Sequence, residues 1–173
     1  MINLNNQISI IIPTFYPGNI ISKCLETLPK NAEIIIIDNG DDIELDLLIK
    51  KKFKYIKHFK TGDIGLPKSF NFALKKAKYE NVLITQPDVT FNENSINRLL
   101  EASTKYHNFG ILAPHVYEDN KYSPYNSLDL SLDKHGELVK IKKNTQKKNF
   151  IPDGDCCVDA VNATAMLVKK SII

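Results

Sequence analysis

Residues 33–40 read Glu-Ile-Ile-Ile-Ile-Asp-Asn-Gly, and this stretch decides the class of fold. Four consecutive isoleucines leave no polar face, so a strand here must be covered on both sides, as in a parallel sheet. Similar apolar, β-branched runs occur at 8–12 and 81–85, with a weaker run at 54–59. A further strand is expected at 110–116. The sequence therefore predicts a sheet that is buried between layers of helices.

Apolar side chains at helical spacing separate these strands. They are Ile20, Ile21, Cys24, Leu25 and Leu28, then Leu45, Leu48 and Ile49, then Phe70, Ala73, Leu74 and Ala77, and last Ile96, Leu99, Leu100 and Ser103. Pro67 stands where the first turn of a helix tolerates proline, and Asn94 is a suitable N-cap. Alternation of strands and helices over the first 110 residues predicts an α/β fold with a doubly wound, mostly parallel sheet.

The pattern changes after about residue 117. Residues 128–143 predict an antiparallel hairpin, with His135 and Gly136 at or near its turn, and residues 158–170 are again strand-like. No repeat or linker divides the chain. We therefore expect a single domain over residues 1–173, with a first half at about 1–116 and a second half at about 117–173.

Composition excludes some classes of function. The chain has 43% hydrophobic and 25% charged residues and a net charge of +3, as a soluble globular protein does. Arg98 is the only arginine, which argues against nucleic-acid recognition, where arginine reads the bases. The lysine runs at 50–54, 140–148 and 169–170 are expected to be solvated, with peripheral contact to a membrane surface as the less favoured alternative.

Cysteine content and the N-terminal residues bear on localisation. Cys24, Cys156 and Cys157 give an odd count without metal-type spacing, so reduced thiols are expected. The first residues lack a basic leader, and no apolar run approaches the ~20 residues of a membrane-spanning helix. These observations predict a cytoplasmic protein, with possible attachment to the inner face of the membrane.

Polar residues follow each predicted strand. They are Pro13-Thr14-Phe15, Asp38-Asn39-Gly40, Thr61-Gly62-Asp63 and Gln86-Pro87-Asp88. In an open α/β sheet, ligands bind beyond the carboxyl ends of the strands, so these groups converge on one rim if the first strand is central. There Asp38 could accept hydrogen bonds from a base or ribose, and Asp88 offers the hard oxygen that Mg²⁺ or Mn²⁺ prefers. The alternative for each residue is an ordinary turn former or helix cap.

Other motifs give weaker signals. Gly62 and Gly65 lack the spacing of a phosphate loop, and turn geometry explains them more simply. The four histidines, His58, His107, His115 and His135, are scattered without carboxylate or cysteine partners at ligand spacing, so a zinc site is not expected. A serine-hydrolase elbow is not found either.

In their order and spacing, these segments resemble family-2 glycosyltransferases of the GT-A type. The segments that carry the resemblance are SIIIPTF (9–15), EIIIIDNG (33–40), GLPKSFNFALKKA (65–77), VLITQPDV (82–89), GILAPHVY (110–117) and VDAVNATAMLVKKSI (158–172). The fourth segment matches the family's Asp-x-Asp position in a form typical of rhamnosyltransferase-like members. The family has a GT-A, Rossmann-like fold, in which the first half binds a nucleotide sugar and the second half faces the acceptor.

The resemblance implies an enzyme that transfers a sugar from a UDP- or dTDP-linked donor to a glycan or lipid-linked acceptor, in cell-surface polysaccharide synthesis. It also implies a divalent metal, Mg²⁺ or Mn²⁺, on the donor diphosphate. Asp88 matches the metal-binding position. The implied donor-binding residues are Pro13, Thr14, Phe15, Asp38, Asn39, Gly65, Lys68, Gln86 and Asp88.

The sequence also departs from the family pattern. Gln86 stands where the family often has Asp or Asn, and Asn162 stands where glycine is usual. The acidic segment that supplies the general base is not found before Ile173, so the catalytic residues are unassigned and the chain is expected to be truncated. An inactive relative that binds a nucleotide sugar or a partner, and a sugar-phosphate nucleotidylyltransferase, are the alternatives.

Overall fold

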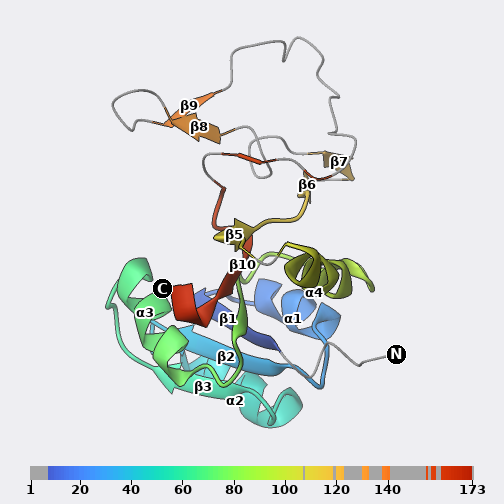
Figure 1. Cartoon of the computed structure of the whole chain (residues 1–173). Helices are drawn as coiled ribbons and strands as arrows, with labels where there is room; N and C mark the ends of the chain where they lie inside the picture. The colour runs from blue at the N-terminus through green and yellow to red at the C-terminus, as the bar shows by residue number, and fades with distance from the viewer. Residues whose placement is uncertain are drawn as a thin grey trace.

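The computed structural model describes residues 8–106, 108–118, 120–122, 130–132, 138–140, 155, 157–158 and 161–172. Six strands form the main sheet: β1 (Ile8–Thr14), β2 (Glu33–Asp38), β3 (Lys57–Lys60), β4 (Asn81–Thr85), β5 (Ile111–Leu112) and β10 (Ala165–Lys169). The helices are α1 (Ile20–Thr27), α2 (Ile43–Lys52), α3 (Leu66–Lys76) and α4 (Ser95–Lys105), followed by the 3₁₀ helix η2 (Lys170–Ile172) (Figure 1).

The sheet has the strand order β3-β2-β1-β4-β10-β5. β1 pairs in parallel with β2 on one side and with β4 on the other, and β2 pairs in parallel with β3. β10 runs antiparallel between β4 and β5. The first strand is therefore central, which confirms the doubly wound, mostly parallel α/β sheet and brings the carboxyl ends of β1 to β4 to one edge.

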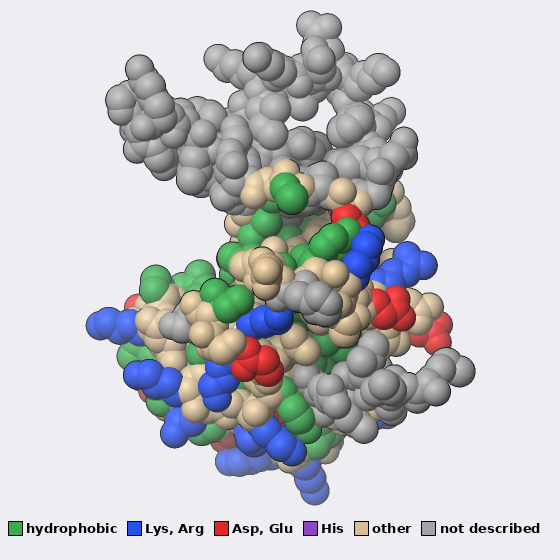
Figure 2. All heavy atoms as spheres, viewed as in Figure 1, with side chains coloured by type: hydrophobic (Ala, Val, Ile, Leu, Met, Phe, Trp, Pro, Cys, Tyr) green, Lys and Arg blue, Asp and Glu red, His purple; other side chains and the backbone are tan. Residues whose placement is uncertain are grey.

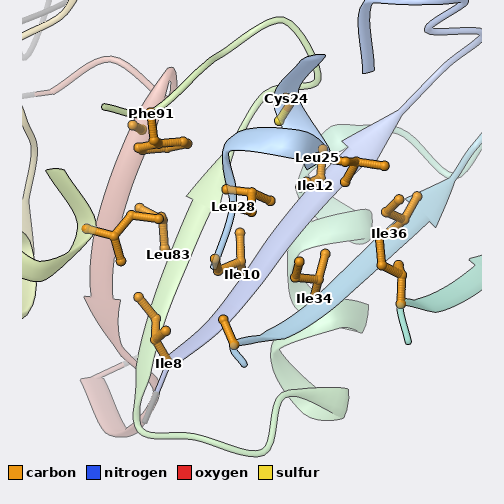
Figure 3. Close-up of a cluster of buried hydrophobic side chains, with 14 of the residues drawn as sticks. Ile8, Ile10, Ile12, Cys24, Leu25, Leu28, Ile34, Ile36, Leu83 and Phe91 are labelled. Atoms are coloured by element: carbon orange, nitrogen blue, oxygen red, sulfur yellow. The ribbon is translucent and has the colours of Figure 1, made fainter. Parts of the chain in front are cut away.

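Isoleucine side chains of the central strands pack into two cores. On one face, Ile10 and Ile36 lie in a cluster with residues of α1, α2 and α4 (Figure 3). On the other face, Ile11 and Ile35 pack with residues of α3. These four side chains are 0% exposed. Because burial of each such side chain contributes about 2 kcal/mol, continuous isoleucine runs are stable only between two helical layers.

Helix ends differ in part from the sequence predictions. Pro67 lies in the first turn of α3, as predicted. Asn94 occupies the N-cap position of α4 but makes no capping hydrogen bond with its side chain. Asp42 caps α2, because its carboxylate accepts hydrogen bonds from the N–H groups of Glu44 and Leu45. Ile20, the first residue of α1, is 48% exposed, whereas Ile21 and Cys24 of the same helix are buried.

Two predicted strands are shorter than expected. The strand predicted at 54–59 begins at Lys57, because the N–H of Ile56 donates to the carbonyl of Phe53 and closes a turn after α2. The strand predicted at 110–116 is confined to Ile111–Leu112, where the backbone pairs with β10. β3 therefore starts later than predicted, but its carboxyl end still lies at the rim.

Short antiparallel pairs follow the main sheet. β6 (Tyr117–Glu118) pairs with β7 (Lys121–Tyr122), and β8 (Leu130–Leu132) pairs with β9 (Leu138–Lys140). The second pair confirms the hairpin predicted at 128–143, although its turn at His135 and Gly136 lies outside the described residues. The predicted division at residues 116 and 117 stays a prediction.

Lysine and arginine side chains, coloured alike in Figure 2, lie mainly over the lower half of the face shown there. The predicted peripheral membrane contact stays a prediction. Within the described part of the chain, none of the helices is both long enough and apolar enough to cross a bilayer.

Glu33 fixes the edge of the sheet that lies opposite the rim. Its carboxylate accepts hydrogen bonds from the Ser9 hydroxyl, from Lys57 Nζ and, at 2.7 Å, from the backbone N–H of Lys78. Burial raises the pKa of Glu33, but the hydrogen bonds from Lys57, Ser9 and Lys78 outweigh burial and lower the pKa below its usual value. The ionised carboxylate therefore joins β1, β2, β3 and the segment after α3.

Replacing this carboxylate should destabilise the fold in a pH-dependent way. We expect Glu33→Gln to lower the free energy of unfolding by about 1 kcal/mol at neutral pH, because charged hydrogen bonds are lost from a partly exposed site. A carboxylate with a lowered folded-state pKa stabilises the fold above its ordinary pKa and loses that contribution in acid. Urea unfolding should therefore show the difference at pH 7 and little of it near pH 3.

Glu101→Gln, at an exposed position on α4, is the matched control and should leave stability unchanged at both pH values. An equal loss of stability for Glu33→Gln at pH 7 and pH 3 would contradict the role of the ionised group.

Candidate functional site

Backbone hydrogen bonds join the ends of β1, β2 and β3 into one rim. Thr14 and Asp38 are paired residues in the β1–β2 register. The N–H of Asn39 donates to the carbonyl of Thr14 at 2.9 Å, and the N–H of Thr61 donates to the carbonyl of Asp38 at 3.0 Å. The Thr14 hydroxyl donates to the carbonyl of Ile37 at 3.3 Å. The predicted residues of three strand ends are therefore brought together.

Asp38 is fully buried at the end of β2. Its Oδ1 accepts a hydrogen bond from the N–H of Gly40 at 3.0 Å, and its Oδ2 accepts one from the N–H of Asp42 at 2.8 Å. The Nε2 atom of His58 lies 3.3 Å from the same Oδ2. A carboxylate has about four lone-pair positions, and three of them face protein groups. The predicted contact of Asp38 with a base or ribose stays a prediction, and it would use the remaining position.

Asn39 connects the rim to α3. Its Oδ1 accepts hydrogen bonds from the hydroxyl groups of Ser69 at 2.9 Å and Thr61 at 3.2 Å, and the residue is 7% exposed. Because Ser69 lies in α3 and Thr61 follows β3, this side chain holds two neighbouring segments against the end of β2. The amide is thereby fixed at the rim position where donor contact was predicted.

Two aromatic rings stand in solvent beside this rim. Phe15 is 60% exposed and Tyr16 is 63% exposed, and their rings meet edge to face at a centroid distance of 5.0 Å. Tyr16 has a positive φ of 47°, and its ring covers Gly40 so closely that a Cβ there would lie 3.1 Å from ring atoms. Sequence reasoning selected Phe15 and missed Tyr16. The signal in the sequence was that Tyr16 is a second aromatic residue directly after Phe15.

The start of α3 places a cation near the rim. Gly65 has a φ of 74°, which favours glycine, and its N–H donates to the Asp63 carboxylate at 3.2 Å. Gly65 thus forms the turn at the N-cap of α3, which agrees with the sequence analysis, where turn geometry explained the two glycines. Lys68 follows in the first turn of α3 with an exposed side chain.

At the end of β4, Asp88 is exposed and Gln86 is half-buried. Cys24, fully buried in α1, lies with its Sγ 3.7 Å from the carbonyl oxygen of Gln86. Burial, together with the negative charge of Asp88, raises the pKa of the Cys24 thiol to about 12. The thiol is therefore protonated and unreactive, and α1 lies directly behind the Gln86–Asp88 segment.

A groove of about 700 Å³ opens beside Asp88. It lies between the segment that follows β4, the start of α4 and the segment that follows β5. Its described lining residues are Gln86, Asp88, Val89, Thr90, Phe91, Asn92, Ser95, Pro114, His115, Val116, Tyr117, Glu118, Asn120, Thr164 and Ala165. This lining is mostly polar and includes neither lysine nor arginine. Sequence reasoning did not single out Glu118 or Tyr117, because they follow a short strand in a segment without periodicity.

Asp88 can hold a divalent cation only with help from other ligands. Among the described residues, His, Cys, Asp and Glu side chains do not gather in threes as a metal-binding group. A single exposed carboxylate nevertheless suits Mg²⁺ or Mn²⁺, because such ions take one or two protein carboxylates and complete their shell with substrate phosphates and water. The residues present thus fit a metal that arrives with a diphosphate.

The sequence of this chain also matches a known protein family. The pattern of glycosyl transferase family 2 matches residues 9–166. This chain belongs to that family. A curated relative, the poly(ribitol-phosphate) beta-glucosyltransferase of Bacillus spizizenii, is 33% identical over 170 residues. The match covers 91% of this chain and 23% of the relative, so the chain spans about a quarter of that relative's length.

Solved structures of glycosyltransferases share the fold. The 1–349 fragment of S. aureus TarS is 25% identical, with a TM-score of 0.56 over 66% of this chain and 36% of that one. The same fragment in complex with UDP-GlcNAc is 24% identical, with a TM-score of 0.58 over 69% and 37% of the two chains. The mannosyltransferase PcManGT of Pyrobaculum calidifontis, in complex with GDP-Man and Mn²⁺, is 16% identical, with a TM-score of 0.54 over 65% and 36%. The family and these structures confirm the GT-A fold expected from the sequence.

The Cys24 thiol offers a direct check of the site's packing. With a pKa near 12, Cys24 in the native protein should react with iodoacetamide at pH 8 roughly a thousandfold more slowly than a free thiol. The measurement needs a variant that keeps Cys24 alone, made by Cys156→Ala and Cys157→Ala, with alkylation followed by mass spectrometry.

A second variant that keeps only Cys157, which is exposed, is the control and should be labelled readily. Unfolding in urea should make Cys24 equally reactive. Rapid labelling of Cys24 in the folded protein would show that α1 does not pack behind the Gln86–Asp88 segment.

Proposed function

We propose that this chain forms the donor-binding part of a glycosyltransferase that uses a nucleotide-diphosphate sugar in cell-surface polysaccharide synthesis. The observation that carries the proposal is the convergence of four strand ends on one rim, with Asp88 exposed beside a groove. Family membership supports the transfer chemistry. The type of pathway has support from the B. spizizenii relative, which is named a poly(ribitol-phosphate) glucosyltransferase. The type of donor has support from TarS, which was solved with UDP-GlcNAc.

The nucleotide would lie across the ends of β1 and β2. Phe15 and Tyr16 offer exposed ring surface on which a base can pack, and Thr14 and Asn39 offer polar groups at the strand ends. Pro13 shapes the same turn at the end of β1, and the exposed Lys68 ammonium can face the phosphates. Asp38 would act mainly by holding the backbone of residues 39–42.

The diphosphate would lie toward β4. Asp88 would hold a Mg²⁺ or Mn²⁺ ion, with Gln86 beside it. Such an ion neutralises the charge that develops on a nucleoside diphosphate leaving group. The groove beside Asp88 would receive the sugar and the acceptor hydroxyl, since its described lining offers hydroxyl, amide and aromatic groups. The general base stays unassigned.

We propose UDP or dTDP as the nucleotide, as the sequence resemblance implies. UDP has support from the TarS complexes, whereas PcManGT was solved with GDP-Man, so the guanine nucleotide belongs in any binding test. The rhamnosyl donor suggested by Gln86-Pro87-Asp88-Val89 stays a prediction and calls for dTDP-rhamnose in the same panel. A nucleotidylyltransferase has no support from the family assignment.

Replacement of Asp88 tests the metal-dependent donor site. We expect UDP or dTDP to bind more tightly with Mn²⁺ than without it in isothermal titration. Asp88→Ala should weaken binding in the presence of Mn²⁺ at least about tenfold, because the lost carboxylate contributes a charge-assisted contact of roughly 1.5–3 kcal/mol. Binding without metal should change little.

Glu93→Gln removes another exposed carboxylate from the same loop and is the matched control. Equal affinity of Asp88→Ala and wild type in Mn²⁺ would reduce Asp88 to a turn residue. Transfer to a glycan acceptor and hydrolysis of the donor should be assayed in parallel. Binding without either reaction would favour the alternative of an inactive relative that binds nucleotide sugars.

A further inference from the structure

His58 on β3 lies between two carboxylates that belong to different elements. Its Nε2 is 3.3 Å from Oδ2 of Asp38 at the end of β2, and its Nδ1 is 3.5 Å from Oδ1 of Asp46 in α2. The imidazole is 9% exposed and the Asp38 carboxylate is fully buried, while the Asp46 side chain is 21% exposed. The ring thus bridges the buried acid of the rim to the helix that follows it.

This geometry suits an imidazole that carries two protons. A neutral ring has one N–H donor, so its second nitrogen would present a lone pair to a carboxylate oxygen. An imidazolium donates from both nitrogens and supplies the positive charge that a buried carboxylate needs. The second carboxylate is ionised as well. A hydrogen bond from Lys50, followed by the charges of Lys50, Lys60 and His58, lowers the pKa of Asp46.

The charged groups that face the ring come from three elements. Asp38 lies on β2 and Asp46 on α2. Lys60, two residues along β3, approaches Asp46 at 3.6 Å, and Lys50 of α2 approaches it at 2.8 Å. Both lysines are exposed, with side-chain exposures of 39% and 70%, so solvent screens their effect on the ring. The closest charged groups to His58 are therefore the two carboxylates.

Asp38 transmits the state of His58 to the rim. The same carboxylate that faces His58 accepts hydrogen bonds from the N–H groups of Gly40 and Asp42. Asp42 in turn caps α2, and the Tyr16 ring lies directly on Gly40. The position of the Asp38 carboxylate thus fixes the backbone between β2 and α2, where nucleotide contact is proposed.

We propose that His58 is a positioning residue for nucleoside diphosphate binding, which as an imidazolium holds the Asp38 carboxylate and through it the backbone of residues 39–42. This inference rests on the proposed function, because it names a residue that acts on the proposed donor site without touching the donor. Only a ring that holds both protons can donate to Asp38 and Asp46 at once.

The nucleotide-free protein supplies the first test. Long-range ¹H–¹⁵N spectra should show both ring nitrogens of His58 protonated at about pH 6, within the range where imidazole titrates. The backbone amide signals of Gly40 and Asp42 should shift with the same midpoint as the ring. A ring with one proton at pH 6, or amide signals that ignore its titration, would overturn the proposal.

Binding of UDP with Mn²⁺ supplies the second test, over about pH 6 to pH 8.5. We expect wild-type affinity to fall as the pH rises, and His58→Gln to bind about tenfold more weakly than wild type at pH 6, with a smaller difference at pH 8.5. The phosphate titration of UDP is common to both proteins, so the comparison removes it. Lys51→Gln, which removes an exposed charge from the same helix, is the control and should follow the wild-type profile.

The two tests separate the inference from the function on which it rests. Absence of UDP, dTDP and GDP binding in the wild type would contradict the proposed function, and the spectra would still decide whether His58 holds the loop. If His58→Gln binds UDP with the wild-type pH profile, the positioning role is overturned, even if the variant is less stable. A lowered melting temperature alone would thus indicate a structural role.

Discussion

The buried carboxylate of Asp38 is the interaction on which the candidate site depends. A carboxylate removed from water is strongly unfavourable unless hydrogen bonds and charge compensate it. Here the N–H groups of Gly40 and Asp42 and the ring of His58 do so. Because these partners come from the loop after β2 and from β3, satisfying one charge also fixes the start of α2 and the shape of the rim.

The parallel sheet gives this arrangement its position. Thr14 is paired with Asp38, and β4 pairs in parallel with the other side of β1. The strand ends therefore share one edge because of the strand pairing, whatever the loops do. The two helical layers then differ in what they contribute. α1 carries the buried Cys24 behind Gln86, and α3 carries Ser69 to the amide of Asn39. The scaffold is therefore apolar, and a few polar contacts at its edge determine the site.

Much of the scaffold follows from the sequence. The isoleucine runs at 8–12 and 33–38 have no polar face, and such runs are stable only in a covered sheet, so the central strands and the rim were predictable. The start of β3 was not, because residues 54–56 have the same character as a strand and only the turn from Phe53 to Ile56 excludes them. Helical spacing also does not show that Ile20, at the first turn of α1, lies outside the core.

The functional side chains were predictable only in part. Their positions at strand ends identified Asp38 and Asp88 as candidates. The sequence did not predict that Asp38 is buried and Asp88 exposed. His58 was dismissed because it has no partner close in sequence. Its partners, Asp38 and Asp46, come from the pairing of β3 with β2 and the packing of α2. Side chains alternate between the two faces of a strand, so His58 lies on the same face of β3 as Lys60, and this alternation was the signal in the sequence.

The central claim, that the four strand ends form one nucleotide site, is tested most directly by mapping UDP onto the backbone amides by NMR in the presence of Mg²⁺. We expect the largest shifts to cluster at residues 14–16, 38–41, 61–65 and 86–88. The hollow at the opposite edge of the sheet, beside Lys30, Lys52 and Tyr55, should stay unchanged. Shifts that centre on that hollow, with the four strand ends unaffected, would contradict it.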